Sequence, residues 1–115
     1  LHMLDAEKSW RHPLEHGYWT ADLLEADYPT LEVLQTEWQA DEAAMRSYLS
    51  RLADEALLRR VRYTADSGVV RERVLWHCLF HLANHGTQQR AEAAALLTGY
   101  GCSPGDLDFT LFLNQ

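Results

Sequence analysis

The chain has 115 residues, with 17 acidic and 10 basic side chains and a formal net charge of −7 at pH 7. Its length and its apolar content of 47% fit one globular domain, residues 1–115, and exclude a disordered chain. The negative balance excludes nucleic acid as the main partner, because phosphate contacts need clustered Lys and Arg. No apolar run approaches the roughly 20 residues that span a bilayer, and two cysteines are too few for a disulfide framework. We therefore expect a cytoplasmic protein with no membrane partner.

The first residues lead directly into a helical pattern, with neither a Met nor a capping residue before it. Residues 1–12 are predicted to form a short helix that ends before Pro13, because the residue before a proline disfavours helical backbone. We expect the chain to be truncated at its N-terminus, with further residues upstream. Residues 13–28 are predicted to be irregular, apart from one helical turn at 21–24.

Residues 30–53 are predicted to form a long amphipathic helix that begins at Pro29 and Thr30. Its apolar stripe is predicted to face the core and comprises Leu31, Leu34, Trp38, Met45, Leu49 and Leu52. The neighbouring carboxylates Asp41 and Glu42 are interpreted as part of a solvated face. In residues 57–69, the apolar Val61 and Tyr63 alternate with polar side chains, and a turn signal follows at 66–68, which predicts an extended excursion or short hairpin between helices.

Residues 70–98 give the strongest helical pattern, and the sequence Gly99-Tyr100-Gly101 is predicted to end this helix. Cys78 lies inside it and is interpreted as a packed thiol. Ser103 and Pro104 resemble a capping residue and a first helical residue, so a short terminal helix is predicted over 104–113. These elements predict an all-α bundle that is one helix short.

Three histidines, His77, His81 and His85, recur at four-residue steps in helix 70–98. Each step rotates a side chain by about 40°, so all three lie within an arc of about 80°. Two histidines at this spacing can chelate one divalent metal, and His2 in the first helix is a candidate for a further ligand. The alternative interpretation is that these histidines are packed core residues.

The segment 81–92, HLANHGTQQRAE, resembles the fourth-helix motif of the DinB-like family, which commonly reads H-x-x-N-H-x-x-x-H-R-G-Q. The opening segment 1–10 is similar to the family's second helix, in which a His is followed by an acidic residue and a Trp. The segment 101–109 is similar to the family's ending. The resemblance therefore spans nearly the whole chain.

The resemblance implies an up-down four-helix bundle, often dimeric, whose first helix is absent from this chain. It also implies a site with three metal-binding histidines. His2 and His85 match two of these ligands, but the third falls on Gln89, whose amide oxygen binds zinc or nickel more weakly than an imidazole does. His81, one turn before His85, is the alternative third ligand. Asp5 and Glu92 are candidates to orient the ligand imidazoles.

The resemblance further implies a metal-dependent enzyme of the thiol transferase or hydrolase type, with an altered metal site and zinc or nickel as its cofactor. Such a metal would activate a thiol or a water. The alternative is a non-catalytic, stress-associated bundle that binds a small molecule or a protein partner in a metal-free pocket. A homodimer is expected, because a missing helix leaves the apolar faces of 31–52 and 70–96 undercovered.

Overall fold

The first helix of the computed structural model, which describes residues 1–64 and 67–114, is α1 (His2–His16). It continues through Pro13, so the prediction that it ends before this residue is wrong. Pro13 lies in the last turn of α1, and both Pro13 and Leu14 are buried, so packing offsets the helical hydrogen bond that the proline nitrogen cannot donate. Gly17 then ends the helix with a left-handed φ of 81°, and its N–H donates to the carbonyl of Pro13 at 3.1 Å.

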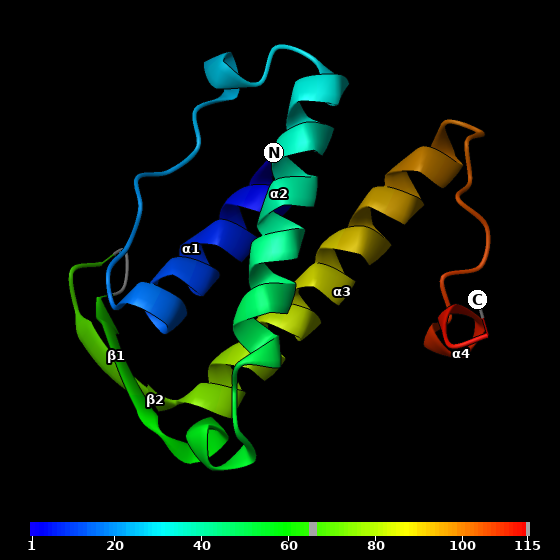
Figure 1. The fold of residues 1–115 in the computed structure, drawn as a ribbon. Coiled ribbons are helices and arrows are strands. Elements are labelled where there is room, and N and C mark those ends of the chain that lie inside the picture. The colour runs from blue at the N-terminus through cyan, green and yellow to red at the C-terminus, as the bar shows by residue number, and fades with distance from the viewer. Residues whose placement is uncertain (65–66, 115) are drawn as a thin grey trace. The chain divides into compact units, whose positions relative to one another are not determined.

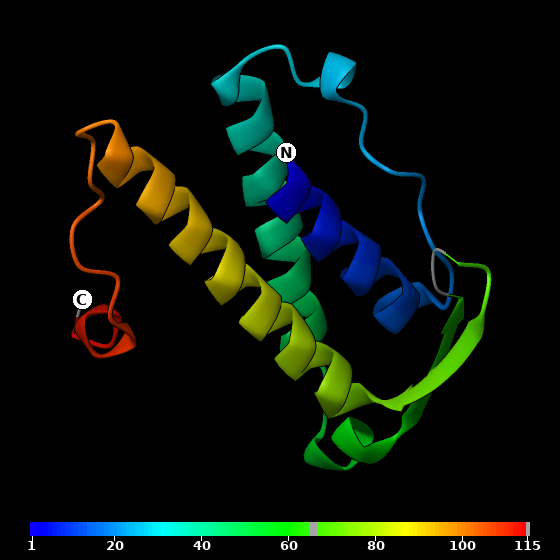
Figure 2. The same ribbon diagram turned by 180° about the vertical axis from the view of Figure 1, so that it is seen from behind.

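The second helix, α2 (Leu31–Ser50), begins as predicted at Thr30, whose Oγ1 accepts a hydrogen bond from the Val33 N–H. It ends at Ser50, three residues before the predicted end at residue 53. Between α1 and α2 the chain is irregular except for one 3₁₀ turn at Glu25–Asp27, slightly later than the predicted turn at 21–24. α1 and α2 run alongside each other in both views (Figures 1 and 2).

A 3₁₀ turn at Asp54–Leu58 leads into an antiparallel hairpin of β1 (Arg60–Thr64) and β2 (Val70–Val74). The hairpin confirms the predicted extended excursion and adds a two-stranded sheet to an otherwise helical chain. The prediction that residues 70–74 are helical is wrong, because they pair with β1 in the register Arg60↔Val74 to Thr64↔Val70. The turn predicted at 66–68 lies partly outside the described residues.

The third helix, α3 (Leu75–Gly99), ends at the predicted glycine. Beyond it, helix α4 is confined to Phe109–Phe112, so the prediction of a helix over 104–113 is wrong. The Ser103 hydroxyl accepts from the Gly105 N–H, and Asp106 accepts from the Asp108 N–H, so local turns hold the backbone there instead of a helix. The cap of α4 is Asp108, which accepts from the Thr110 N–H at 2.8 Å.

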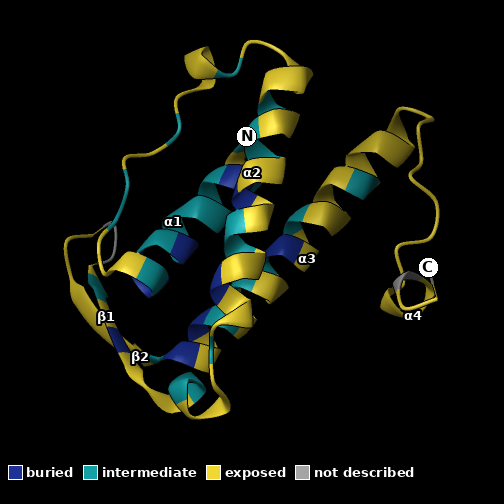
Figure 3. Cartoon of the chain, viewed as in Figure 1, coloured by how far each residue is buried: buried dark blue, intermediate teal, exposed yellow. Residues whose placement is uncertain are grey.

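The chain divides into two compact units, Leu1–Ala83 and Asn84–Gln115, and α3 continues across the boundary between them. The core of the first unit is a cluster of buried side chains from both helices, the hairpin and the start of α3: Leu14, Tyr48, Val61, Leu75 and Cys78. Figure 3 shows this core as the dark blue segments where these elements meet. In the second unit most side chains of known exposure are exposed, and Gly86 is buried.

The apolar stripe predicted for α2 forms the core only in part. Leu31 is 78% exposed and Leu49 is 43% exposed, whereas Tyr48 and Asp41 are the buried residues of this helix. The chain is mostly helical, as predicted, although the hairpin departs from an all-α fold. Among the described residues, no helix is long and apolar enough to cross a membrane.

Candidate functional site

The predicted metal ligands lie on two helices. His2 is in the first turn of α1, and His81, His85 and Gln89 follow one another at four-residue steps along α3. His2 and His81 are exposed, and His85 and Gln89 are half-buried. The continuous helix over Leu75–Gly99 therefore gives the last three residues the single stripe that their spacing predicts.

The boundary between the two compact units falls between His81 and His85. His2 and His81 thus belong to the first unit, and His85 and Gln89 belong to the second. Within residues 1–64 and 67–114, no three His, Cys, Asp or Glu side chains gather closely enough to hold a metal ion. That finding concerns these four residue types, so it does not cover a set completed by the Gln89 amide.

Two of the α3 histidines contact tryptophans. The His81 ring lies 5.0 Å from the Trp10 ring of α1, centroid to centroid. Trp10 in turn contacts Trp19 and Tyr63, so His81 borders an aromatic cluster of the first unit. His77 lies against Trp76, the residue before it, at 4.1 Å.

The two carboxylates proposed to orient ligand imidazoles both have other partners. The Asp5 Oδ1 accepts a hydrogen bond from the Leu23 N–H at 2.9 Å, which ties the segment before α2 to α1. Glu92 accepts from the Gln88 side chain at 3.0 Å, one turn earlier on α3. Both contacts are compatible with a structural role for these carboxylates.

A polar network between α1 and α2 was not predicted from the sequence. Asp41 is 3% exposed, so its interpretation as part of a solvated face is wrong. The Arg11 guanidinium, itself 7% exposed, donates from Nε at 3.0 Å and from Nη2 to the same Asp41 oxygen. The spacing of Leu34, Trp38, Asp41, Met45, Tyr48 and Leu52, alternately three and four residues, was the available signal, because it puts Asp41 on the buried stripe.

Further contacts extend this network along the two helices. Lys8 pairs with Glu37, and the Trp38 indole donates to Glu7 at 2.8 Å. Burial lowers the pKa of the Arg11 guanidinium, but hydrogen bonds and attraction from Asp41 and Glu15 outweigh it and raise that pKa overall. Arg11 is therefore charged at every accessible pH.

His12, next to Arg11, has a buried Nδ1 with no hydrogen-bond partner among the described residues. Burial is the main cause that lowers the pKa of this imidazole, and the positive charges of Arg11 and protonated His16 lower it further. Asp41 acts in the opposite direction but does not outweigh them. The folded protein therefore favours the neutral form of His12.

The lowered pKa of His12 predicts a loss of stability in mild acid. The unfolded chain takes up a proton on His12 near the ordinary histidine pKa of about 6.5, whereas the folded chain takes it up only at lower pH. The contribution of His12 to stability is thus complete above about pH 6.5 and falls as the pH decreases below it. Chemical denaturation at a series of pH values should show a shallower decline for His12→Gln than for the parent.

His77 provides the control for this experiment. It is an exposed histidine on α3 and is not one of the groups that shift the pKa of His12. The variant His77→Gln should keep the pH dependence of the parent. If the stability of His12→Gln fell with pH as steeply as that of the parent, His12 would not be the source of the acid sensitivity.

The two cysteines differ in burial. Cys78 is 2% exposed within the core cluster, and burial raises the pKa of its thiol. Cys102 is exposed. The packed thiol predicted at position 78 is confirmed.

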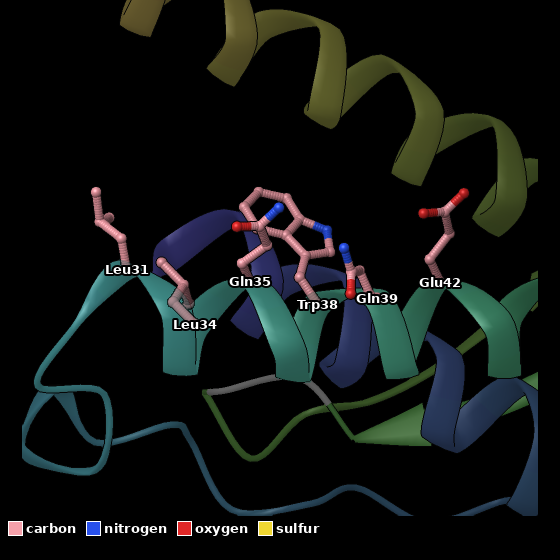
Figure 4. A pocket seen from close by; sticks show the side chains of 6 residues that line it. All are labelled: Leu31, Leu34, Gln35, Trp38, Gln39 and Glu42. Atoms are coloured by element: carbon pink, nitrogen blue, oxygen red, sulfur yellow. The ribbon is translucent and has the colours of Figure 1, made fainter.

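A hollow of about 490 Å³ lies along α2 (Figure 4). It is lined by Leu31, Leu34, Gln35, Trp38, Gln39 and Glu42, whose side chains stand on one side of the helix. None of these six is a predicted metal ligand. The hollow combines apolar side chains with two amide groups and is open to solvent.

Comparisons with known proteins complete this description. The family model that describes the DinB family matches residues 1–115. No curated protein matches the chain. No solved structure matches it either.

Proposed function

The chain belongs to the DinB family, and on this premise we propose that it is a metal-dependent enzyme of the thiol transferase or hydrolase type with an altered metal site. The proposed ligands are His2 and His85, with Gln89 as a weak third donor. The observation that supports this most is the continuity of α3, which keeps His85 and Gln89 one turn apart on one stripe. We propose zinc or nickel as the metal and the cytoplasm as the location.

The donor set supports a weak metal site better than a tight one. Imidazole nitrogen suits zinc and nickel, whereas a neutral amide oxygen is a poor ligand for either. Two imidazoles and one amide also leave coordination positions open. A metal bound there would lower the pKa of a coordinated water or thiol. His85 and Gln89 would hold it from α3, and His2 from α1.

His81 was the alternative third ligand. Its ring lies against Trp10, at the edge of the aromatic cluster of the first unit. This contact favours a packing role for His81, so we assign the third position to Gln89. The two assignments differ in outcome, since His81→Ala weakens metal binding only if His81 is a ligand.

Zinc titration by calorimetry tests the site. We expect Gln89→His to tighten zinc binding by about tenfold or more, because an imidazole replaces an amide, and we expect His85→Ala to abolish it. His77→Ala is the matched control, since His77 lies on the same helix two turns before His85. It should leave zinc affinity unchanged. Unchanged affinity in Gln89→His would contradict the proposal.

One observation favours a second candidate function. The amide of Gln89 at a ligand position suits a bundle that binds a small molecule or a protein without metal. In that case the parent would not bind zinc, and His85→Ala would have no zinc binding to abolish. The same titration therefore separates the two functions.

A further inference from the structure

Gly86 is a glycine that the backbone of α3 does not require. It lies in the interior of the helix, where glycine is less stable than alanine, and its φ is not in the left-handed region. It is nevertheless buried in a segment whose other side chains are mostly exposed. The reason for a glycine at this position therefore lies in what packs over it.

The guanidinium of Arg90 occupies the space beside Gly86. A Cβ at position 86 would lie only 2.9 Å from the Arg90 Nη1 and 3.7 Å from its Cζ, so the glycine leaves room that an alanine would fill. The Arg90 Nη2 also donates a hydrogen bond to the Thr87 Oγ1 at 3.2 Å. These two contacts hold the guanidinium against α3, one turn before the position of Arg90 itself.

The two partners of this guanidinium are neutral. Within residues 84–114 Arg90 makes no ion pair, although the segment contains three carboxylates. Each of these carboxylates accepts a local hydrogen bond instead: Glu92 from the Gln88 side chain, Asp106 from the Asp108 N–H, and Asp108 from the Thr110 N–H. The positive charge of Arg90 is thus fixed in place without a carboxylate of this segment to balance it.

The fixed guanidinium lies next to two of the proposed metal ligands. Gly86 follows His85 by one residue, and Arg90 follows Gln89 by one residue, so the two pairs form neighbouring stripes about 100° apart around α3. Because the Arg90 side chain folds back to Gly86, its guanidinium lies near the level of Gly86, about 1.5 Å of helix rise from His85. All four residues belong to the second unit.

A guanidinium in this position is suited to bind an anion. Its planar N–H groups match the oxygens of a carboxylate or a phosphate and bind them by charge-assisted hydrogen bonds. The net charge of −7 repels small anions from the chain in general, so an anion needs a fixed local cation of this kind.

We infer that Arg90, positioned by Gly86 and Thr87, binds the carboxylate or phosphate group of the small molecule on which the proposed site acts. The inference rests on the proposed function, since it names the chemical class of the ligand of that site, a small anion. His85 and Gln89 would hold the metal on one stripe of α3, and Arg90 would hold the anionic group on the next stripe. Arg90 is therefore a specificity-determining residue.

An NMR titration of the isotope-labelled full chain, without added metal, tests the anion site. Sodium phosphate and sodium acetate are the two probes, at an ionic strength kept constant with sodium chloride. At least one of them should shift the signals of Gly86, Thr87 and the Arg90 side chain in a saturable way, and the tighter one identifies phosphate or carboxylate as the preferred group. Arg90→Gln should weaken this binding by about tenfold or more.

Gly86→Ala separates the position of the guanidinium from its charge. The variant keeps Arg90, but the added Cβ displaces the guanidinium, so anion binding should weaken. Its midpoint of thermal unfolding should rise, because alanine favours the helix and only the end of a flexible side chain must move. Gly99→Ala is the matched control on α3, since a Cβ there has nothing within 4 Å, and it should keep the anion affinity of the parent.

Four results would each overturn the inference: no saturable shift in the parent, parental affinity in Arg90→Gln, parental affinity in Gly86→Ala, or an equal loss in Gly99→Ala. The zinc titration described above keeps this test separate from the proposed function. If zinc binds the parent but Arg90→Gln keeps the anion affinity, only the inference fails. If Arg90 binds the anion but the parent does not bind zinc, only the proposed metal site fails.

Discussion

Replacement of Asp41 by Ala is expected to lower the free energy of unfolding by about 3 kcal/mol, toward the lower end of the range for breaking a buried ion pair. The Arg11 guanidinium would stay buried between α1 and α2 without its main partner. Glu15 also accepts from Arg11, at 3.1 Å, which is why the expected loss is not larger. Urea denaturation followed by circular dichroism measures it.

Glu42→Ala is the matched control for this experiment. Glu42 follows Asp41 on the same helix, but it is exposed and pairs with the exposed Arg46, a contact worth about 0.3–0.5 kcal/mol. The double variant Arg11→Met/Asp41→Leu removes both charges at once, so it should be more stable than Asp41→Ala. If Glu42→Ala lowered the free energy of unfolding as much as Asp41→Ala does, burial of the Arg11–Asp41 pair would not be the cause of the lost stability.

Truncation of Leu75 to Ala is the second large expected effect. Leu75 is fully buried at the start of α3, in the cluster with Leu14, Tyr48, Val61 and Cys78. Removal of its side chain creates a cavity where hairpin and helices meet, at an expected cost of about 2–5 kcal/mol. Denaturant unfolding should show a lower midpoint with an unchanged slope.

Leu31→Ala supplies the comparison, since Leu31 is 78% exposed in the first turn of α2. A surface substitution of this kind stays within about 0.5 kcal/mol. If the two variants lost equal stability, the core would not lie where α3 begins.

The helices could be predicted because their signals are local. Thr30 caps α2 by its own side chain, and the predicted Gly99-Tyr100-Gly101 stop ends α3, with Gly101 at a left-handed φ of 76°. The residues 70–74 could not be assigned in this way. Val70 and Val74 are four residues apart, which puts them on one face of a helix but also, as an even spacing, on one face of a strand. The partner strand β1 decides between the two, and pairing is not a local property.

The candidate site shows the same division. The spacing of His81, His85 and Gln89 is a local property of one helix and was predicted from the sequence. The contact of His81 with Trp10 joins two helices, and so does the contact of Asp41 with Arg11. Neither contact follows from helical periodicity alone, because each depends on how α1 packs in the first unit.

The carbonyl of Leu14 has a consequence for how the molecule opens. It belongs to the last turn of α1, where helical carbonyls lack partners and ends usually fray. Here it accepts from the Tyr48 hydroxyl of α2 at 3.2 Å and from Arg59 beside the hairpin. The last turn of α1 cannot loosen without releasing both. The last turn of α1, the part of α2 around Tyr48 and the start of the hairpin therefore form one cooperative element. When this element opens, all three segments become exposed together.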